Sequence, residues 1–395
     1  MVKGLHPRNV LLIVTLSHTM QHIFVGSSIL FPLIISELNL DYTTFGVIIA
    51  LASSIGGLSQ MMFSIASRRV SRHILLGSGN MALSIGMIIT GLSKGISDLA
   101  FARLLSNIGT APQHPIGTAI ISEKFDSRST GKALGFHYGI AYIGNIVGPI
   151  LMTVSAIALG WRMTFLIFSI PALIVGLTIV WYLGKDPSIS GRGIRDRHAV
   201  KDLKSDLTSI LRVRGIPFVL ASQIAISGGV DIGILTTYIP IFLADFIRID
   251  VYERSLIYAI GLLGGSIGPL LLGRYGDIAG YLRIAPTAAG IASILVYSMV
   301  MHKSSSILLA LHIFLLMFTG FSLPTLLQSY IVRSVYGYDR DLVVGLFFTV
   351  NFISNSIWAA VIGYIVDVYS SFDPALILMG SLGLIGMLIL LVQIN

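Results

Sequence analysis

Residues 374–394 read PALILMGSLGLIGMLILLVQI, a run that contains no acidic, basic or histidine side chain. Because about 20 apolar residues in a helix cross the hydrocarbon core of a bilayer, this stretch predicts a membrane-spanning helix. Eleven similar segments precede it. We place the twelve spans at 9–36, 42–66, 74–93, 98–122, 132–158, 161–183, 216–244, 254–274, 284–301, 306–332, 342–366 and 374–394.

The composition of the whole chain excludes a soluble protein. Of its 395 residues, 54% are hydrophobic and 11% are charged, against roughly 25% charged in an ordinary soluble domain. The absence of cysteine excludes disulfides, zinc–thiolate sites and a cysteine nucleophile. The spans contain neither HExxH nor paired aspartates. We therefore expect an all-α integral membrane protein that is not an enzyme and that needs no metal and no cofactor.

The net charge of +8 is a topology signal. With the N-terminus inside, most of the 26 lysines and arginines fall in the inner loops, which is the bias of cytoplasmic loops. We expect a multi-pass protein of the cell membrane with both termini cytoplasmic, working as a monomer and binding no nucleic acid. The first span is too long for a signal peptide, so we treat it as an uncleaved helix.

A hydrophilic stretch at 184–214 divides the spans six and six, into bundles at 1–183 and 215–395. We expect this stretch to be a cytoplasmic linker with a short amphipathic helix at 197–211. The two halves also match at an offset of about 208–210 residues, as in parallel repeats of transporters. The matched pairs are Pro32 with Pro240, Pro115 with Pro324, Gly135 with Gly345 and Asn145 with Asn355.

Residues 273–283 read GRYGDIAGYLR. They resemble the loop signature of the major facilitator superfamily, in which glycine, aspartate, glycine and a basic residue follow at fixed spacing. The corresponding first-half loop has Ser67 in place of the aspartate. Residues 144–149 read GNIVGP, which is similar to a motif enriched among proton-driven exporters of that superfamily. By resemblance, the conformational motifs are Gly144, Gly148, Pro149, Gly273, Asp277, Gly280 and Arg283.

This resemblance implies the major facilitator fold, with two pseudo-symmetric six-helix bundles and alternating access. It also implies that the first, fourth, seventh and tenth spans line a central cavity. Ser17–His18, Phe31–Pro32–Leu33 and Gln113–His114–Pro115 resemble the narrower group of fosmidomycin-resistance exporters. That group has an acidic residue where this chain has Gln21 and His22.

Ionisable residues inside a membrane are costly, so each one is a site hypothesis. Asp231 is the carboxylate that lies well inside a span, and Tyr238 shares its face. We expect His137 to serve as a packing or hinge residue and His302 to be solvated. The candidate substrate and proton-coupling residues are His18, Gln21, His22, Arg103, Asn107, His114, Asp231, Tyr238, His312, Asn351 and Asn355.

These groups favour a proton-coupled secondary transporter of a small organic solute. Histidines and a desolvated carboxylate can change charge near neutral pH, and one arginine with several histidines favours an anionic substrate over a cationic drug. We expect export by antiport, with uptake by symport as the alternative. A metal carrier that uses His18, His22 and His114, or a non-transporting receptor, is a further alternative.

Overall fold

The computed structural model of the protein describes residues 4–67, 69–125, 130–190, 208–302, 304, 306–334 and 340–394. Every regular element within these ranges is helical. Ten of the helices found there are long and apolar enough to cross a membrane. The predicted all-helical membrane fold is therefore confirmed. The predicted linker and its amphipathic helix lie largely outside the described residues, at 191–207.

Two features explain why ten long helices stand where the sequence predicts twelve spans. Helix α7 (Thr130–Thr178) and the π-helical turn Ile179–Leu183 join the fifth and sixth predicted spans. The chain turns at Gly160, whose φ of 79° is disfavoured for residues with a Cβ. The fourth predicted span is divided into α5 (Ile96–Thr110), a π-helical turn at Gln113–Gly117, and α6 (Thr118–Lys124).

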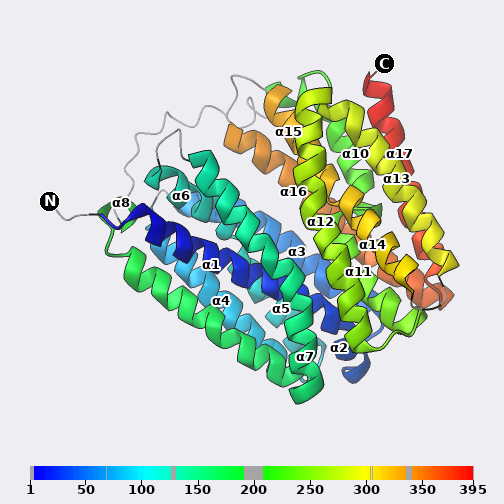
Figure 1. Ribbon diagram of the computed structural model, residues 1–395, viewed down its shortest axis with the longest axis horizontal. Coiled ribbons are helices and arrows are strands. Elements are labelled where there is room, and N and C mark those ends of the chain that lie inside the picture. The colour runs from blue at the N-terminus through cyan, green and yellow to red at the C-terminus, as the bar shows by residue number, and fades with distance from the viewer. Residues whose placement is uncertain are drawn as a thin grey trace. The chain divides into compact units, whose positions relative to one another are not determined.

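The chain forms two compact units, and unit 1 comprises Met1–Leu38 and Leu51–Asp196. In it α1 packs against α7, while α4 packs against α5 and α7 (Figure 1). An apolar cluster that includes Val10, Val14, Ile116 and Ile120 surrounds the N-terminal part of α1. Besides α5, α6 and α7, its helices are α1 (Pro7–Gly26), α2 (Phe31–Glu37), the later part of α3 (Tyr42–Ala66), α4 (Arg72–Leu92) and α8 (Pro187–Ser190).

Unit 2 comprises Asn39–Ala50 and Arg197–Asn395. In it α10 packs against α16 and α17, α12 against α14, and α13 against α17. The first turn of α3 belongs to this unit, where Asp367 accepts hydrogen bonds from the backbone N–H groups of Tyr42 (3.0 Å) and Thr43 (2.6 Å). Its other helices are α10 (Ile216–Gly229), α11 (Ile232–Ile241), α12 (Val251–Ala279), α13 (Tyr281–Ser298), α14 (Ile307–Gly320), α15 (Ser322–Ser334), α16 (Arg340–Tyr369) and α17 (Asp373–Ile394).

Asp186 ties three parts of unit 1 together beyond the membrane-spanning helices. Its buried carboxylate forms an ion pair with Lys124 and accepts hydrogen bonds from Leu5 N (2.8 Å) and Ser188 Oγ (2.7 Å). Burial opposes its ionisation, but the hydrogen bonds from Lys124, Ser188 and Leu5 outweigh burial and lower the pKa of Asp186 below its ordinary value. This contact fixes the start of α1 to the ends of α6 and α7.

Candidate functional site

Four predicted spans are interrupted inside their length, and they are the first, fourth, seventh and tenth. The breaks fall at the 3-10 turn Ser27–Leu30 between α1 and α2, at the π-helical turn after α5, at Val230–Asp231 between α10 and α11, and at Phe321 between α14 and α15. By contrast α3, α4, α12, α13, α16 and α17 are each continuous. In secondary transporters, discontinuous helices build the binding site.

Local chemistry explains these breaks. Pro32, Pro115 and Pro324 lack the N–H that would continue the helical hydrogen bonds, and each follows or lies in a break. In the seventh span the residues before the break are Gly228 and Gly229, and Asp231 begins the next helix by accepting a hydrogen bond from Gly233 N (3.2 Å). An aspartate that accepts from the second N–H of a helix is a common N-cap.

In unit 1, four histidines meet where α1 crosses α7 and the π-helical turn after α5. The ring of His18 lies with its centroid 4.6 Å from that of His22, 4.7 Å from His137 and 5.1 Å from His114. His18 and His137 are buried, and His22 is half-buried. The structure therefore brings His18, His22 and His114 together and adds His137, which the sequence analysis assigned to packing.

Three of these rings are joined end to end by hydrogen bonds. His137 Nε2 lies 3.0 Å from His18 Nδ1, and His18 Nε2 lies 3.1 Å from His22 Nε2. The outer nitrogens reach Thr15 Oγ1 (3.0 Å from His137 Nδ1) and Asn145 Oδ1 (2.7 Å from His22 Nδ1). We call this set of Thr15, His137, His18, His22 and Asn145 the histidine chain.

Amides and hydroxyls border the histidine chain. Gln113 accepts hydrogen bonds from Ser17 Oγ (2.7 Å) and Gln21 Nε2 (3.4 Å), and Asn80 Nδ2 donates to Ser17 Oγ (2.8 Å). Gln21 thus lies beside the histidines, as predicted from its position. Gln113 and Asn80 are fully buried but were not among the predicted site residues. Gln113 directly precedes His114 in the sequence.

Arg103 of α5 lies against the C-terminal end of α1 and the start of α2. Its guanidinium carbon is 5.0 Å from the ring centroid of Phe24 and 5.1 Å from that of Phe31. The buried atoms Nε and Nη1 have no hydrogen-bond partner among the described residues. Asn107 instead donates to the carbonyl of Arg103 (2.9 Å), so the structure does not bring Asn107 to the histidines.

In unit 2, Asp231 is enclosed by amides. Its carboxylate accepts from Asn351 Nδ2 (3.0 Å), Asn355 Nδ2 (3.0 Å) and Gln223 Nε2 (3.4 Å), in addition to Gly233 N. The structure therefore groups three predicted residues, Asp231, Asn351 and Asn355. Gln223 was not predicted, although it lies two helical turns before Asp231 on α10.

Tyr238 and His312 are not part of this group. The hydroxyl of Tyr238 donates to the carbonyl of Ala359, and its ring packs on Phe372 at a centroid distance of 6.0 Å. His312 donates from Nε2 to Leu295 O (2.7 Å), and its Nδ1 accepts from His302 Nε2 (2.8 Å). His302 is thus half-buried and paired rather than solvated, and burial followed by the proximity of His312 lowers the pKa of His302.

The predicted conformational motifs form close contacts. A Cβ on Gly144 would lie 2.6 Å from the carbonyl oxygen of Thr19, and one on Gly148 would lie 3.0 Å from Ile23 Cα, so these glycines let α7 approach α1. Pro149 lies against Gly26, where an added Cβ would be 2.7 Å from it. The approach of these helices is what sets His22 beside Asn145.

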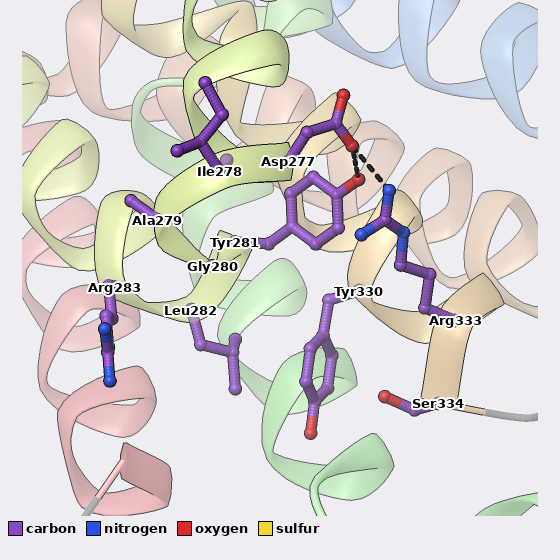
Figure 2. Close-up of a pocket in the computed structure, with 11 residues that line it drawn as sticks. Asp277, Ile278, Ala279, Gly280, Tyr281, Leu282, Arg283, Tyr330, Arg333 and Ser334 are labelled. Atoms are coloured by element: carbon purple, nitrogen blue, oxygen red, sulfur yellow. Dashed lines mark hydrogen bonds and ion pairs between the residues drawn. The ribbon is translucent and has the colours of Figure 1, made fainter.

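The loop motif between α12 and α13 surrounds a pocket of about 630 Å³ (Figure 2). Asp277 accepts hydrogen bonds from the Tyr281 hydroxyl and from Arg333 Nη2 (2.6 Å). Gly280 has a φ of 96°, which ends α12 and which a side chain would strain. Arg283 lines the same pocket, whereas Gly273 has no contact closer than ordinary van der Waals distance.

Within the described ranges, no group of three or more His, Cys, Asp or Glu side chains is arranged to hold a metal ion. In the histidine chain, the ring nitrogens bond to one another, to Thr15 and to Asn145.

An all-helical membrane protein whose interrupted spans carry buried polar groups has the architecture of a secondary transporter. The family model of the Major Facilitator Superfamily matches residues 11–323 of this chain. The chain belongs to the Major Facilitator Superfamily, and it is a transporter rather than an enzyme.

The relatives and solved structures agree with this family. A probable L-galactonate transporter of Escherichia coli is 23% identical over 89% of this chain and 81% of the relative, and a probable sulfoacetate transporter of Cupriavidus necator is 20% identical over 91% and 86%. Multidrug resistance protein 2 of Bacillus subtilis is 27% identical over 52% of this chain and 53% of its own length. A crystal structure of the nucleoside transporter NupG shares the fold, with a TM-score of 0.82, 13% identity, and coverage of 98% of this chain and 100% of that one.

Proposed function

We propose that the protein transports a small organic anion by alternating access and couples this transport to protons. The observation that carries the proposal is the guanidinium of the half-buried Arg103, whose buried atoms Nε and Nη1 lack hydrogen-bond partners among the described residues. Leaving a buried charged donor unpaired is costly, and a guanidinium suits a carboxylate or sulfonate oxygen. The L-galactonate and sulfoacetate relatives support an anionic substrate.

The charge of the histidine group favours uptake by symport over the export by antiport that the sequence predicts. In the described part of the chain, the aromatic rings that contact His18 belong to three histidines and Tyr138, so this ring group contains no carboxylate. A proton added to these rings creates a cation that attracts an anion. Proton and anion therefore favour each other's binding, and in an alternating-access cycle they travel together.

Antiport of a cationic, drug-like molecule is a second candidate, and Asp231 favours it. The hydrogen-bond partners that the structure gives this buried carboxylate are a backbone N–H and amides, so a cationic substrate could pair with it. The match to Multidrug resistance protein 2 and the narrower resemblance to fosmidomycin-resistance exporters also support an export function.

The remaining features of the proposal come from the sequence. We place the protein in the cell membrane with both termini cytoplasmic, because basic residues concentrate in the inner loops. The two six-helix bundles are 1–183 and 215–395, joined by the linker 184–214. The protein acts as a monomer.

Uptake into proteoliposomes tests this function. Vesicles buffered at pH 7.5 are diluted into medium at pH 6.0 or 7.5 that contains labelled L-galactonate, sulfoacetate or tetraphenylphosphonium. We expect one of the anions to accumulate only with the inward proton gradient, and we expect a protonophore to abolish the accumulation. Extrusion of the cation by an inward proton gradient, with no movement of either anion, would favour drug antiport instead.

A further inference from the structure

The histidine chain has a definite direction. The oxygen of the Asn145 amide can only accept, so His22 Nδ1 carries a proton and donates to it. A neutral His22 then accepts at Nε2 from His18, a neutral His18 accepts at Nδ1 from His137, and His137 accepts at Nδ1 from the Thr15 hydroxyl. In this arrangement all six ring nitrogens are hydrogen-bonded.

The chain also runs along a membrane-spanning helix. Thr15, His18 and His22 follow one another on one face of α1, and seven residues of α-helix rise about 10 Å. The histidine chain therefore extends over about a third of a hydrocarbon core that is roughly 30 Å thick. His22 is half-buried, whereas Thr15 is buried beside Val14 of the apolar cluster. His22 is thus the more exposed end of the chain, and Thr15 is the enclosed end.

We propose that the histidine chain is the proton carrier of the transport cycle, loading one proton at His22 and holding it at His137 against the hydroxyl oxygen of Thr15. This inference rests on the proposed function and deepens it. It assigns the proton to a site made entirely of α1 and α7 residues. Hydrogen-bonded imidazoles are suited to this task because each ring accepts a proton on one nitrogen and releases one from the other.

The loading step balances with the three rings kept in place, and only the Asn145 amide turns. It starts from the opposite polarity, in which the Asn145 amide is turned and each ring proton sits on the other nitrogen. A proton binds His22 Nδ1, His22 passes its Nε2 proton to His18, and His18 passes its Nδ1 proton to His137. Three N–H bonds form and two break, so one proton is gained. His137 then donates from Nδ1 to Thr15 Oγ1, and the Asn145 oxygen again accepts from His22.

Among the residues that the structure describes, the groups found against the histidine chain are uncharged or titratable rings, hydroxyls and amides, without a carboxylate. They are His114 of the π-helical turn, with Tyr138 and Tyr142 of α7. Gln113 lies alongside through Ser17 and Gln21. A proton held at His137 therefore lacks a carboxylate partner within the chain, and an organic anion bound in unit 1 would lower its free energy. This explains why the proton and the anion would be taken up together.

Thr15 gives the sharpest test, because valine has nearly its shape but no oxygen to accept from His137. Labelled L-galactonate and sulfoacetate are the probes, in proteoliposomes with Thr15→Val, Thr15→Ser and the matched control Thr19→Val. Thr19 is one turn further along α1, and its hydroxyl donates to the carbonyl of Thr15 (3.0 Å). Exchange of anion at equal pH and accumulation driven by pH are measured separately.

We expect Thr15→Val to lose about tenfold or more of the pH-driven accumulation, since positioned proton transfer contributes at least that much, and to keep anion exchange within about twofold of the wild type. Thr15→Ser should restore accumulation, and Thr19→Val should behave like the wild type. Wild-type accumulation by both Thr15→Val and His137→Gln would overturn the proposal.

A spectroscopic experiment tests the proton-carrier role of the histidine chain separately from the proposed transport function. In protein labelled with ¹⁵N-histidine, couplings across the N–H···N bonds should link His137 to His18 and His18 to His22. On acidification, His137 should be the first of the three rings to carry protons on both nitrogens. If neither probe moves with protons but this signature appears, the substrate assignment is wrong and the chain stands. First protonation at His22 alone, without His137, would overturn the chain.

Discussion

Arg103 is a single residue on which the choice of substrate charge depends. Replacing it with Gln should weaken L-galactonate or sulfoacetate binding about tenfold or more, because hydrogen bonds to charged groups contribute roughly 1.5–3 kcal/mol. Thermal stability should stay the same or rise, since the change removes a buried charge whose Nε and Nη1 are unpaired among the described residues. Binding calorimetry and a thermal melt measure the two effects.

Two variants control this prediction. Arg103→Lys keeps the positive charge but loses the planar fork, so its affinity should fall between those of the wild type and Arg103→Gln. Arg162→Gln removes an arginine that pairs with Glu37 at 3.0 Å and donates to the carbonyls of Gly91 and Ser93, and it should leave anion affinity unchanged. Full affinity in Arg103→Gln would remove the main argument for an anion.

The variant Asp231→Asn tests whether the Asp231 carboxylate or the histidine chain carries the proton. Four N–H groups donate hydrogen bonds to its carboxylate. We expect Asp231→Asn to keep the N-cap and most pH-driven accumulation of anion, but to lower the melting temperature because an NH2 group then faces other donors. Loss of accumulation with intact exchange would instead make Asp231 the coupling group.

At the scale of elements, Asp186 fastens the start of α1 to the ends of α6 and α7. Since the pKa of Asp186 is lowered in the folded protein, its stabilising effect is fully present above the ordinary aspartate pKa and is lost as the pH falls through the lower folded value. Asp186→Asn should therefore destabilise the protein by about 3 kcal/mol at pH 7, as expected when one partner of a buried ion pair is removed.

Thermal melts between pH 7 and pH 3 check this effect. The difference between wild type and Asp186→Asn should shrink with acidity. Glu123→Gln is a suitable comparison, because Glu123 pairs with Arg72 nearer the surface and should contribute less. A difference that is constant across this pH range would contradict the ionic role of Asp186.

Asp277 belongs to the same scale, because it joins the last turn of α12 to the last turn of α15 through Arg333. The side chains of Asp277 and Arg333 are 51% and 62% exposed, so their ion pair should contribute at most about 1 kcal/mol to stability. We expect Asp277→Asn to change the balance between inward- and outward-facing states while anion affinity in each state is kept. Labelling of single cysteines introduced into this cysteine-free chain reports that balance, and unchanged labelling rates would contradict the prediction.

The sequence was most informative where one element suffices to define the geometry. The apolar segments predicted the all-helical membrane fold, and the proline positions predicted the irregular helix around His114. The contact of Asn351 and Asn355 with Asp231 joins different helices and was not predicted. The role of His137 could not be derived in this way. Its contact with His18 depends on how closely α7 approaches α1 at Gly144 and Gly148, which is a property of packing between helices. The pairing of His302 with His312 likewise depends on the path between α13 and α14.

At the scale of the whole molecule, the four interrupted spans are the main structural evidence for a transporter. They are the spans that the family resemblance assigns to the cavity. His114 lies in the break of the fourth span, and Asp231 lies in the break of the seventh. Unit 1 holds the guanidinium and the histidine chain, and unit 2 holds the amide-bound Asp231. A substrate anion with a proton in unit 1 is the chemistry to which these groups are best suited.

The most direct test of this account is the number of protons that the purified protein exchanges when an anion binds. Calorimetric titration of L-galactonate or sulfoacetate at pH 7, in buffers with different enthalpies of ionisation, measures that number without any transport. The account predicts uptake of about one proton per bound anion, because a proton on the histidine chain and the anion stabilise each other. Release of a proton on binding, or no exchange at all, would contradict proton-coupled anion transport by this protein.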